Sequence, residues 1–190
     1  NEGFATYFDA LYTEHRKGAD EFLLRLLEYA DAYHAEDGGQ YRRPIVTRTY
    51  QDPEDLFDRH SYQKAALVLH MLRFLLGDGL WWKAINHYCH KHARMTVETA
   101  DFRIAIEEAT GHSLDGFFSQ WLYGAGHPEF HLSWRWDAKA GRVAATVKQT
   151  QTLAGGTPVF RLPVVLRVYG PEGPEDHRVD VEQPEHTFWL

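Results

Sequence analysis

Residues 62–76, YQKAALVLHMLRFLL, are apolar on nearly every side of a helical wheel. A helix of this kind is usually buried among other helices, whereas a surface helix has one apolar stripe. The most apolar stretch, residues 65–71, is interrupted by His70, and the chain has no run of about 18 apolar residues. We therefore expect residues 62–76 to form the central helix of a helical core, and we expect no membrane span.

Helical periodicity continues on both sides of this stretch and stops at glycines. Helices are expected over residues 4–17, 22–36, 62–76, 81–92, 99–110 and 113–123, with a loop over residues 40–58. Thr99 and Ser113 have the side chains of N-cap residues for the last two helices. Residues 77–79, Gly-Asp-Gly, are expected to end the central helix.

The periodicity changes from 3.6 to 2 near His127 and Pro128. Apolar and polar residues then alternate over residues 130–136, and further strands are expected over 143–149, 162–168 and 179–181. The fold class is therefore α+β, with a helical part over residues 1–127 and a β part over residues 128–190. The aromatic face formed by Phe130, Trp134 and Trp136 is expected to lie in a buried surface that the two parts share.

Composition excludes some classes of partner. The 190 residues include 20 basic and 27 acidic side chains, which give a net charge of -7 without any basic block, so nucleic acid is not an expected partner. The single cysteine, Cys89, forms no internal disulfide and slightly favours the cytoplasm, but the localisation is otherwise unknown. The chain opens on Asn1 and closes on the apolar run 187–190, so we expect a piece of a longer protein.

Two carboxylates and one phenol are candidates for chemistry. Glu2 and Asp9 are seven residues apart on the first helix and share a face, where they could bind a metal. Alternatively, Glu2 is an acid favoured by the helix dipole and Asp9 is a solvated side chain. Tyr62, at the start of the central helix, could donate a hydrogen bond to an oxyanion, although such a tyrosine more often serves in packing.

The residues His87, Cys89, His90 and His92 suggest a metal cluster at first sight. On a helix, however, the His87–His90 pair and the Cys89–His92 pair point in different directions, and no second ligand pair follows at zinc-finger spacing. We interpret this segment as a partly solvated helix face with a buried cysteine. His70 is interpreted as a core histidine with a hydrogen-bond partner.

Five short stretches resemble one enzyme family. Asn1-Glu2-Gly3-Phe4-Ala5 and Ser61-Tyr62-Gln63-Lys64-Ala65 are similar to the Asn-Glu-Gly-Phe-Ala and Tyr-x-Lys-Gly-Ala segments of the aminopeptidase N-like zinc metallopeptidases, the gluzincin aminopeptidases. Residues 73–78, 96–102 and 117–128 agree with the same family in order and spacing. The resemblance covers roughly residues 1–151. It implies the α-helical lobe of a thermolysin-like catalytic domain, followed by a small antiparallel β-sandwich segment.

The resemblance also implies site residues. Glu2 matches the family's third zinc ligand, Tyr62 matches the tyrosine that stabilises the oxyanion, and Asp9 falls where an acid could hold a zinc-bound histidine. The H-E-x-x-H motif, which supplies two zinc ligands and the general base, is absent from these 190 residues. The Gly-x-Met-Glu-Asn type of loop that recognises the substrate amino terminus is absent too, and Ala65 stands where the family usually has glycine.

These matches and departures together imply part of a zinc-dependent aminopeptidase that hydrolyses N-terminal peptide bonds. We expect this chain alone to be inactive and to bind no zinc, because the two histidine ligands and the general base would lie upstream. The alternative is a non-catalytic, aminopeptidase-like scaffold that serves in protein interaction. The substrate's side-chain preference and the oligomeric state cannot be read from the sequence.

Overall fold

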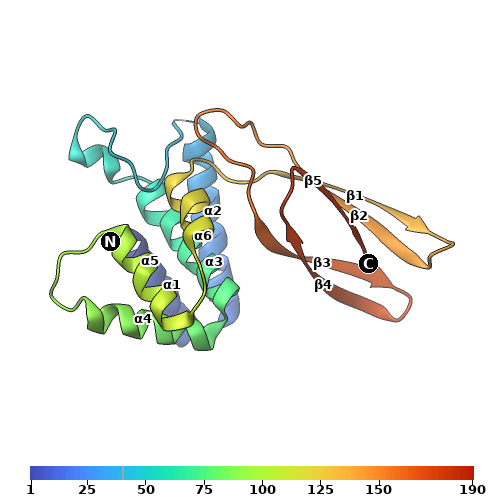
Figure 1. Ribbon diagram of the computed structural model, residues 1–190, viewed down its shortest axis with the longest axis horizontal. Helices are drawn as coiled ribbons and strands as arrows, with labels where there is room; N and C mark the ends of the chain where they lie inside the picture. Colours follow the sequence, from blue (N-terminus) through green and yellow to red (C-terminus); the bar gives the residue numbers. More distant parts are fainter. Residues whose placement is uncertain (40) are drawn as a thin grey trace. The chain divides into compact units, whose positions relative to one another are not determined.

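The computed structural model describes residues 1–39 and 41–190. The chain divides into two compact units, a helical unit over Asn1–Ala125 and a β unit over Gly126–Leu190. The elements of both units are shown in Figure 1. Helices precede strands throughout, which confirms the α+β class. No helix among the described residues is both long and apolar enough to cross a membrane.

The helical unit contains every helix that the periodicity predicts. Its α-helices are α1 (Glu2–Lys17), α2 (Ala19–Gly39), α3 (Ala65–Leu76), α4 (Asp78–Lys91), α5 (Thr99–Thr110) and α6 (Asp115–Phe118). The π-helical turns η2 (His60–Lys64) and η3 (Ser119–Tyr123) precede α3 and follow α6. Residue 40 of the expected loop over residues 40–58 lies outside the described residues, and residues 41–58 hold a 3-10 turn, η1 (Pro53–Leu56). The central helix is therefore two joined pieces, η2 and α3.

Two predicted N-caps were wrong, and side-chain hydrogen bonds explain both. Gly77 ends α3 with a φ of 75°, as predicted, and α4 follows directly at Asp78. The N-cap of α5 is Glu98 and not Thr99, because the Asp101 carboxylate accepts a hydrogen bond of 2.8 Å from the Glu98 N–H. Ser113 caps no helix: α6 starts after Leu114, whose N–H donates to the Glu107 carboxylate at 2.7 Å.

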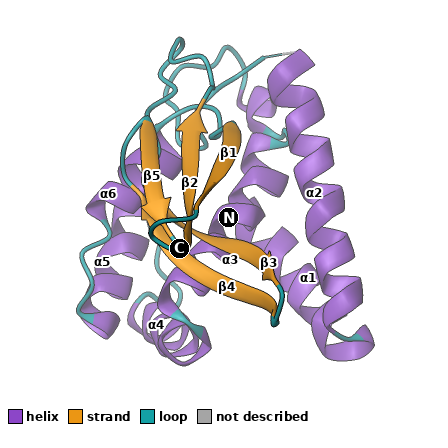
Figure 2. Ribbon diagram, turned by 90° about the vertical axis from the view of Figure 1, so that its right-hand side faces the viewer, coloured by secondary structure: helices purple, strands orange, loops and turns teal. Residues whose placement is uncertain are grey.

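The core of the helical unit lies around α3, as predicted. Helix α1 packs against both α2 and α3, and α4 packs against α3 and α5. Figure 2 shows these helices from the side. Aromatic rings fill the space between the helices: Tyr7 and Trp81 are fully buried and meet edge to face at a centroid distance of 5.8 Å. Burial of such large apolar side chains is the main favourable term in folding.

Gly3 permits α1 to approach the start of α3 unusually closely. A Cβ atom added at Gly3 would lie 2.5 Å from the Cβ of Ala65 and 3.1 Å from the Ala65 carbonyl carbon. Real Cβ atoms do not approach other carbon atoms to 2.5 Å, so any larger residue at position 3 must push the two helices apart. The glycine in the Asn-Glu-Gly-Phe segment is thus explained by helix packing.

The β unit has five antiparallel strands in two sheets. Its strands are β1 (Phe130–Asp137), β2 (Arg142–Gln149), β3 (Leu162–Gly170), β4 (Gly173–Val181) and β5 (Glu185–Trp189). The order in the larger sheet is β1-β2-β5, and β3 and β4 form a separate hairpin. The apolar run that closes the chain belongs to β5, which pairs with β2 so that Ala145 lies opposite Phe188.

The aromatic face of β1 is not covered by the rest of the β unit, and its place in a surface shared with the helical unit stays a prediction. Phe130, Trp134 and Trp136 are exposed, and Trp134 retains 71% of its accessible surface. Alternation in a sequence identifies side chains that share a face, but it does not say what covers that face. Strand β1 is the edge of its sheet. The buried residues of this unit include Val147 on the central strand β2 and Phe160 in the connection before β3.

The contact between Gly3 and Ala65 gives the first testable prediction. Gly3→Ala should lower the free energy of unfolding of the chain by about 1–3 kcal/mol, because the added methyl group overpacks the contact. Adding Ala65→Gly should restore part of the loss, since it removes the nearest atom and leaves only the backbone contacts. Urea unfolding of both variants measures the effect.

A matched control is available in α2. Gly38→Ala places a methyl group where no atom lies within 4 Å, so this variant should be at least as stable as the wild type. A Gly3→Ala chain as stable as the Gly38→Ala chain would show that α1 and α3 do not approach each other as described.

Candidate active site

Glu2 lies in the first turn of α1, at the wall of a cavity of about 700 Å³. The other walls include Ser61 and Ala65 at the junction of η2 and α3, and the segment over residues 95–99 before α5. The close approach at Gly3 sets this arrangement, since Glu2 precedes Gly3 directly. A carboxylate is thereby held beside the entry to the central helix.

Tyr62 is the third residue of the π-helical turn η2. The Tyr62 N–H donates to the Asp58 carbonyl at 3.1 Å, and the Lys64 N–H donates five residues back to the Arg59 carbonyl at 2.8 Å. Such π-helical insertions are rare in helices and are frequent at functional sites. Partial desolvation and the nearby Glu2 carboxylate raise the pKa of the Tyr62 phenol. The structure therefore brings Glu2 and Tyr62 together.

Asp9 lies apart from this pair. It is two turns, about 10 Å, further along α1. Its side chain is exposed and accepts a long hydrogen bond of 3.5 Å from the Tyr29 hydroxyl. The role of Asp9 beside a zinc-bound histidine stays a prediction.

The histidines of α4 have separate partners, as their spacing suggested. His87 lies 3.0 Å from the Glu108 carboxylate, and His90 Nδ1 lies 2.9 Å from the Asn86 carbonyl oxygen.

Cys89 is exposed, so the expectation of a buried cysteine was wrong: its position on the helix turns it toward solvent. His70 is half-buried against the Tyr7 hydroxyl at 3.1 Å, and burial lowers its pKa, as expected for a neutral core histidine.

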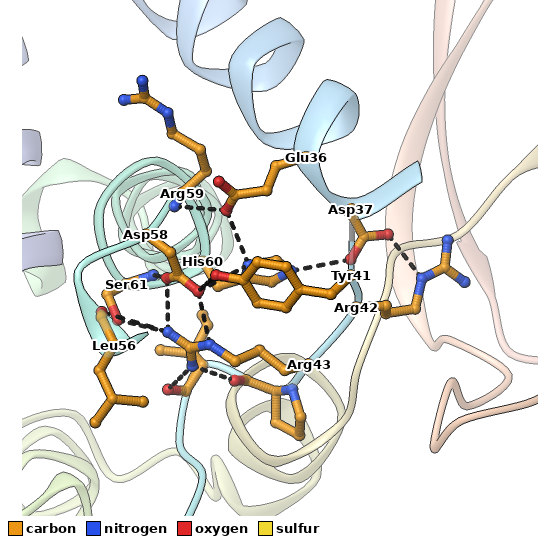
Figure 3. A network of polar contacts seen from close by, with 12 residues as sticks. Glu36, Asp37, Tyr41, Arg42, Arg43, Leu56, Asp58, Arg59, His60 and Ser61 are labelled. Carbon is orange, nitrogen blue, oxygen red and sulfur yellow. Dashed lines mark hydrogen bonds and ion pairs between the residues drawn. The ribbon is translucent and has the colours of Figure 1, made fainter. Parts of the chain in front are cut away.

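Sequence reasoning missed a buried polar network next to Tyr62. Its centre is the Asp58 carboxylate, which receives Arg43 Nε at 2.7 Å and Nη2 at 2.6 Å and a short hydrogen bond from the Tyr41 hydroxyl. The Ser61 N–H also donates to Asp58 at 2.9 Å, which ties the network to η2. Figure 3 shows these side chains converging from α2, the following loop and η2.

His60 lies in the same network and is fully buried. Its Nδ1 atom is 3.2 Å from Glu36 Oε1 and 3.3 Å from Asp58 Oδ2, while its Nε2 atom is 3.2 Å from Asp37 Oδ1. Burial alone would lower the pKa of His60, but the nearby carboxylates of Asp37 and Asp58 outweigh burial and raise it. Burial would likewise raise the pKa of Asp58, but His60, Arg43 and Tyr41 hold it well below its usual range.

Glu36, Asp58 and His60 form the one group in the described ranges whose atoms are close enough to hold a metal together. The atoms that would bind a metal already have other partners. Arg43 makes a two-point ion pair with Asp58, and both ring nitrogens of His60 lie close to carboxylates. A metal would have to displace a guanidinium or a proton from each of these contacts. The group is therefore better described as an ion-pair network than as a metal centre.

Comparison with known proteins identifies the family. The model of the peptidase family M1 domain matches residues 1–121, which is more than half of the chain. The chain therefore belongs to peptidase family M1. The match includes Glu2 and Tyr62 but ends before the β unit.

Individual relatives agree with this assignment. The chain is 28% identical over 160 residues to aminopeptidase M1 of Arabidopsis thaliana, covering 83% of this chain and 18% of that protein. It is 31% identical over 138 residues to glutamyl aminopeptidase of Sus scrofa, covering 70% of this chain and 14% of that protein. The chain thus spans less than one fifth of the length of either relative.

Solved structures show the same fold. Aminopeptidase A of Legionella pneumophila, crystallised in complex with aspartic acid, superposes with a TM-score of 0.79 at 20% identity and covers 100% of this chain and 21% of that one. An M1 zinc metallopeptidase from Deinococcus radiodurans superposes with a TM-score of 0.54 at 25% identity, covering 67% of this chain and 28% of that one.

The Arg43–Asp58 pair gives the second testable prediction. Its side chains are only 11% and 6% exposed, so Arg43→Met would leave a buried carboxylate without its main partner. The cost should be about 3 kcal/mol in the free energy of unfolding, as is typical of a broken buried pair. In contrast, Arg25→Met removes an exposed pair with Glu28 and should cost less than about 1 kcal/mol. Equal losses in the two variants, measured by urea unfolding, would contradict the account of the network.

Proposed function

We propose that this chain forms part of a zinc aminopeptidase that hydrolyses N-terminal peptide bonds, with Glu2 as a zinc ligand and Tyr62 as a catalytic residue. The observation that carries the proposal is the proximity of Glu2 and Tyr62 at the packed junction of α1 and η2, in a chain that belongs to peptidase family M1. A carboxylate and a phenol at one site are the groups needed for metal binding and for oxyanion stabilisation.

Zinc fits the Glu2 side of this site only in part. A catalytic zinc site takes three protein ligands and leaves a fourth position open, and Glu2 supplies one carboxylate. The remaining ligands would come from an H-E-x-x-H motif, which the 190 residues do not contain. When bound, zinc would polarise the substrate carbonyl and lower the pKa of a bound water.

The contribution of Tyr62 follows from its protonation. A tyrosine phenol has an ordinary pKa of about 10 and is protonated at neutral pH, and the raised pKa of Tyr62 keeps its hydroxyl available as a donor. A hydroxyl that donates to the developing oxyanion stabilises the transition state more than the substrate, which is the requirement for a faster chemical step. The rigid backbone of η2 would hold this hydroxyl in place before the substrate arrives.

The ligand count gives the third testable prediction. The 190-residue chain should bind no stoichiometric zinc, because a tight site needs more ligands than Glu2 can offer. Elemental analysis after mild chelation is the measurement. One zinc per chain that survives chelation would reveal a site that the proposal lacks.

Tyr62 gives the fourth testable prediction, for the full-length enzyme. Tyr62→Phe should raise the activation free energy by about 3 kcal/mol, as for other oxyanion donors, and should therefore lower kcat roughly a hundred- to a thousandfold. KM and the thermal midpoint should stay close to wild type, because the ring remains in place. Steady-state kinetics on a peptide substrate measures both constants.

Glu2→Gln is the comparison variant. It should lower the zinc content together with the activity, whereas Tyr62→Phe should leave the zinc content unchanged. Full kcat in the Tyr62→Phe enzyme would return Tyr62 to a packing role. The absence of an H-E-x-x-H motif about eighteen residues before Glu2 in the full-length sequence would favour the non-catalytic scaffold.

A further inference from the structure

The carboxylates around His60 favour two protons on its ring. A neutral imidazole carries one N–H and presents a lone pair at its other nitrogen. Nε2 lies 3.2 Å from Asp37 Oδ1, whereas Nδ1 lies 3.2 Å from Glu36 Oε1 and 3.3 Å from Asp58 Oδ2 without a hydrogen bond to either. A positively charged ring is attracted to all three carboxylates at these distances and a neutral ring is not, so the charges around His60 favour the imidazolium.

The charged and titratable groups around His60 come from α2, the following loop and η2. Asp37 also binds Arg42 at 2.8 Å, and Asp58 also binds Arg43. The aromatic rings of Tyr33 and Tyr41 lie against the imidazole, with centroid distances of 5.5 and 5.4 Å. Among the described residues, the groups on or next to this ring are Tyr33, Glu36, Asp37, Tyr41, Arg42, Arg43, Asp58 and Lys64, of which Arg42 contacts Asp37 and Lys64 contacts the Tyr33 ring.

This arrangement links the charge of His60 to the position of Tyr62. His60 is the first residue of η2 and holds the end of α2 through Glu36 and Asp37. The Asp58 carboxylate that faces His60 also accepts the Ser61 N–H, and the Asp58 carbonyl accepts the Tyr62 N–H. Loss of the proton would leave the three carboxylates facing a neutral ring and would loosen the turn that carries Tyr62.

We propose that His60 is a positioning residue, held as an imidazolium between α2 and Asp58, whose charge fixes the η2 turn and so controls catalysis by Tyr62. This role rests on the proposed function and adds a form of pH regulation to it. His60 itself touches neither the reacting atoms nor Glu2, so it acts through Tyr62.

The sign of the pH dependence follows from the raised pKa of His60 in the folded state. The unfolded value is near 6.5, so the contribution of His60 is complete below about pH 6.5. The contribution is lost as the pH rises through the raised folded value. The turn should therefore be well ordered at neutral pH and should loosen in alkaline solution.

The first arm of the test reads the ring directly. In the 190-residue chain with 15N-labelled histidine, NMR should show both ring nitrogens of His60 protonated at pH 7. His70, which lies against the Tyr7 hydroxyl and has a lowered pKa, is the internal control and should be neutral at that pH. A singly protonated His60 ring at pH 7 would overturn the proposal.

The second arm uses the zinc-loaded full-length enzyme. His60→Gln should lower kcat at pH 7 by about tenfold to a hundredfold through misplacement of Tyr62, while KM changes less than about twofold. The decline of kcat toward alkaline pH that is caused by His60 should disappear in this variant. His70→Gln should keep both the wild-type kcat and the wild-type pH profile.

The outcomes separate the two proposals. An unchanged kcat and pH profile in His60→Gln would overturn the positioning role, even if the ring is charged. A wild-type enzyme that hydrolyses no peptide would contradict the proposed function and the role in catalysis with it. In that case the NMR arm would still decide whether His60 is held as an imidazolium.

Discussion

The close approach of Gly3 to Ala65 is the constraint on which the candidate site depends. Glu2 lies next to Gly3 on α1, and Tyr62 lies about one helical turn before Ala65, so the contact fixes both at once. Because a side chain at position 3 would meet Ala65 at 2.5 Å, the distance between the two elements is determined by backbone and methyl atoms. Such contacts adjust little, since protein interiors are close-packed.

Ion pairs hold the central helix at both ends. At its start, Arg43 and His60 neutralise the carboxylates of α2 and Asp58. At its end, Arg73 binds Glu14 of α1 at 2.8 Å and Asp78 of α4 at 2.7 Å. Pairs that are partly buried and geometrically fixed specify one arrangement of neighbouring elements, because a displaced partner leaves a charge without compensation. The apolar body of α3 supplies burial, and these end groups define its register against α1 and α2.

The sequence predicted much of the fold because its signals are local. The apolar pattern of residues 62–76 and the alternation after Pro128 gave the helices and strands, and two short motifs led to Glu2 and Tyr62. The N-caps at Glu98 and Leu114 were missed because each depends on which nearby acid accepts a backbone N–H. Strand periodicity placed Trp134 on one face of β1 but could not show that the β unit leaves this face uncovered.

The His60 network was out of reach for a different reason. Its members are separated by about twenty residues in the chain, and an acid in the segment over residues 54–60 gives no signal that distinguishes a buried partner from a solvated one. The π-helical turn was equally hidden, because nothing in the sequence of residues 60–64 distinguishes a π-helical turn from the first turn of an α-helix. Only the three-dimensional arrangement shows that a motif residue, Tyr62, is carried by a turn anchored through buried charges.

Anomalous X-ray diffraction at the zinc edge, on crystals of the full-length protein, tests the central claim most directly. The account predicts a zinc peak about 2.0–2.2 Å from a carboxylate oxygen of Glu2, with the Tyr62 hydroxyl facing the same open side of the metal. A zinc peak that lies away from Glu2, for instance at Glu36, Asp58 and His60, would contradict it.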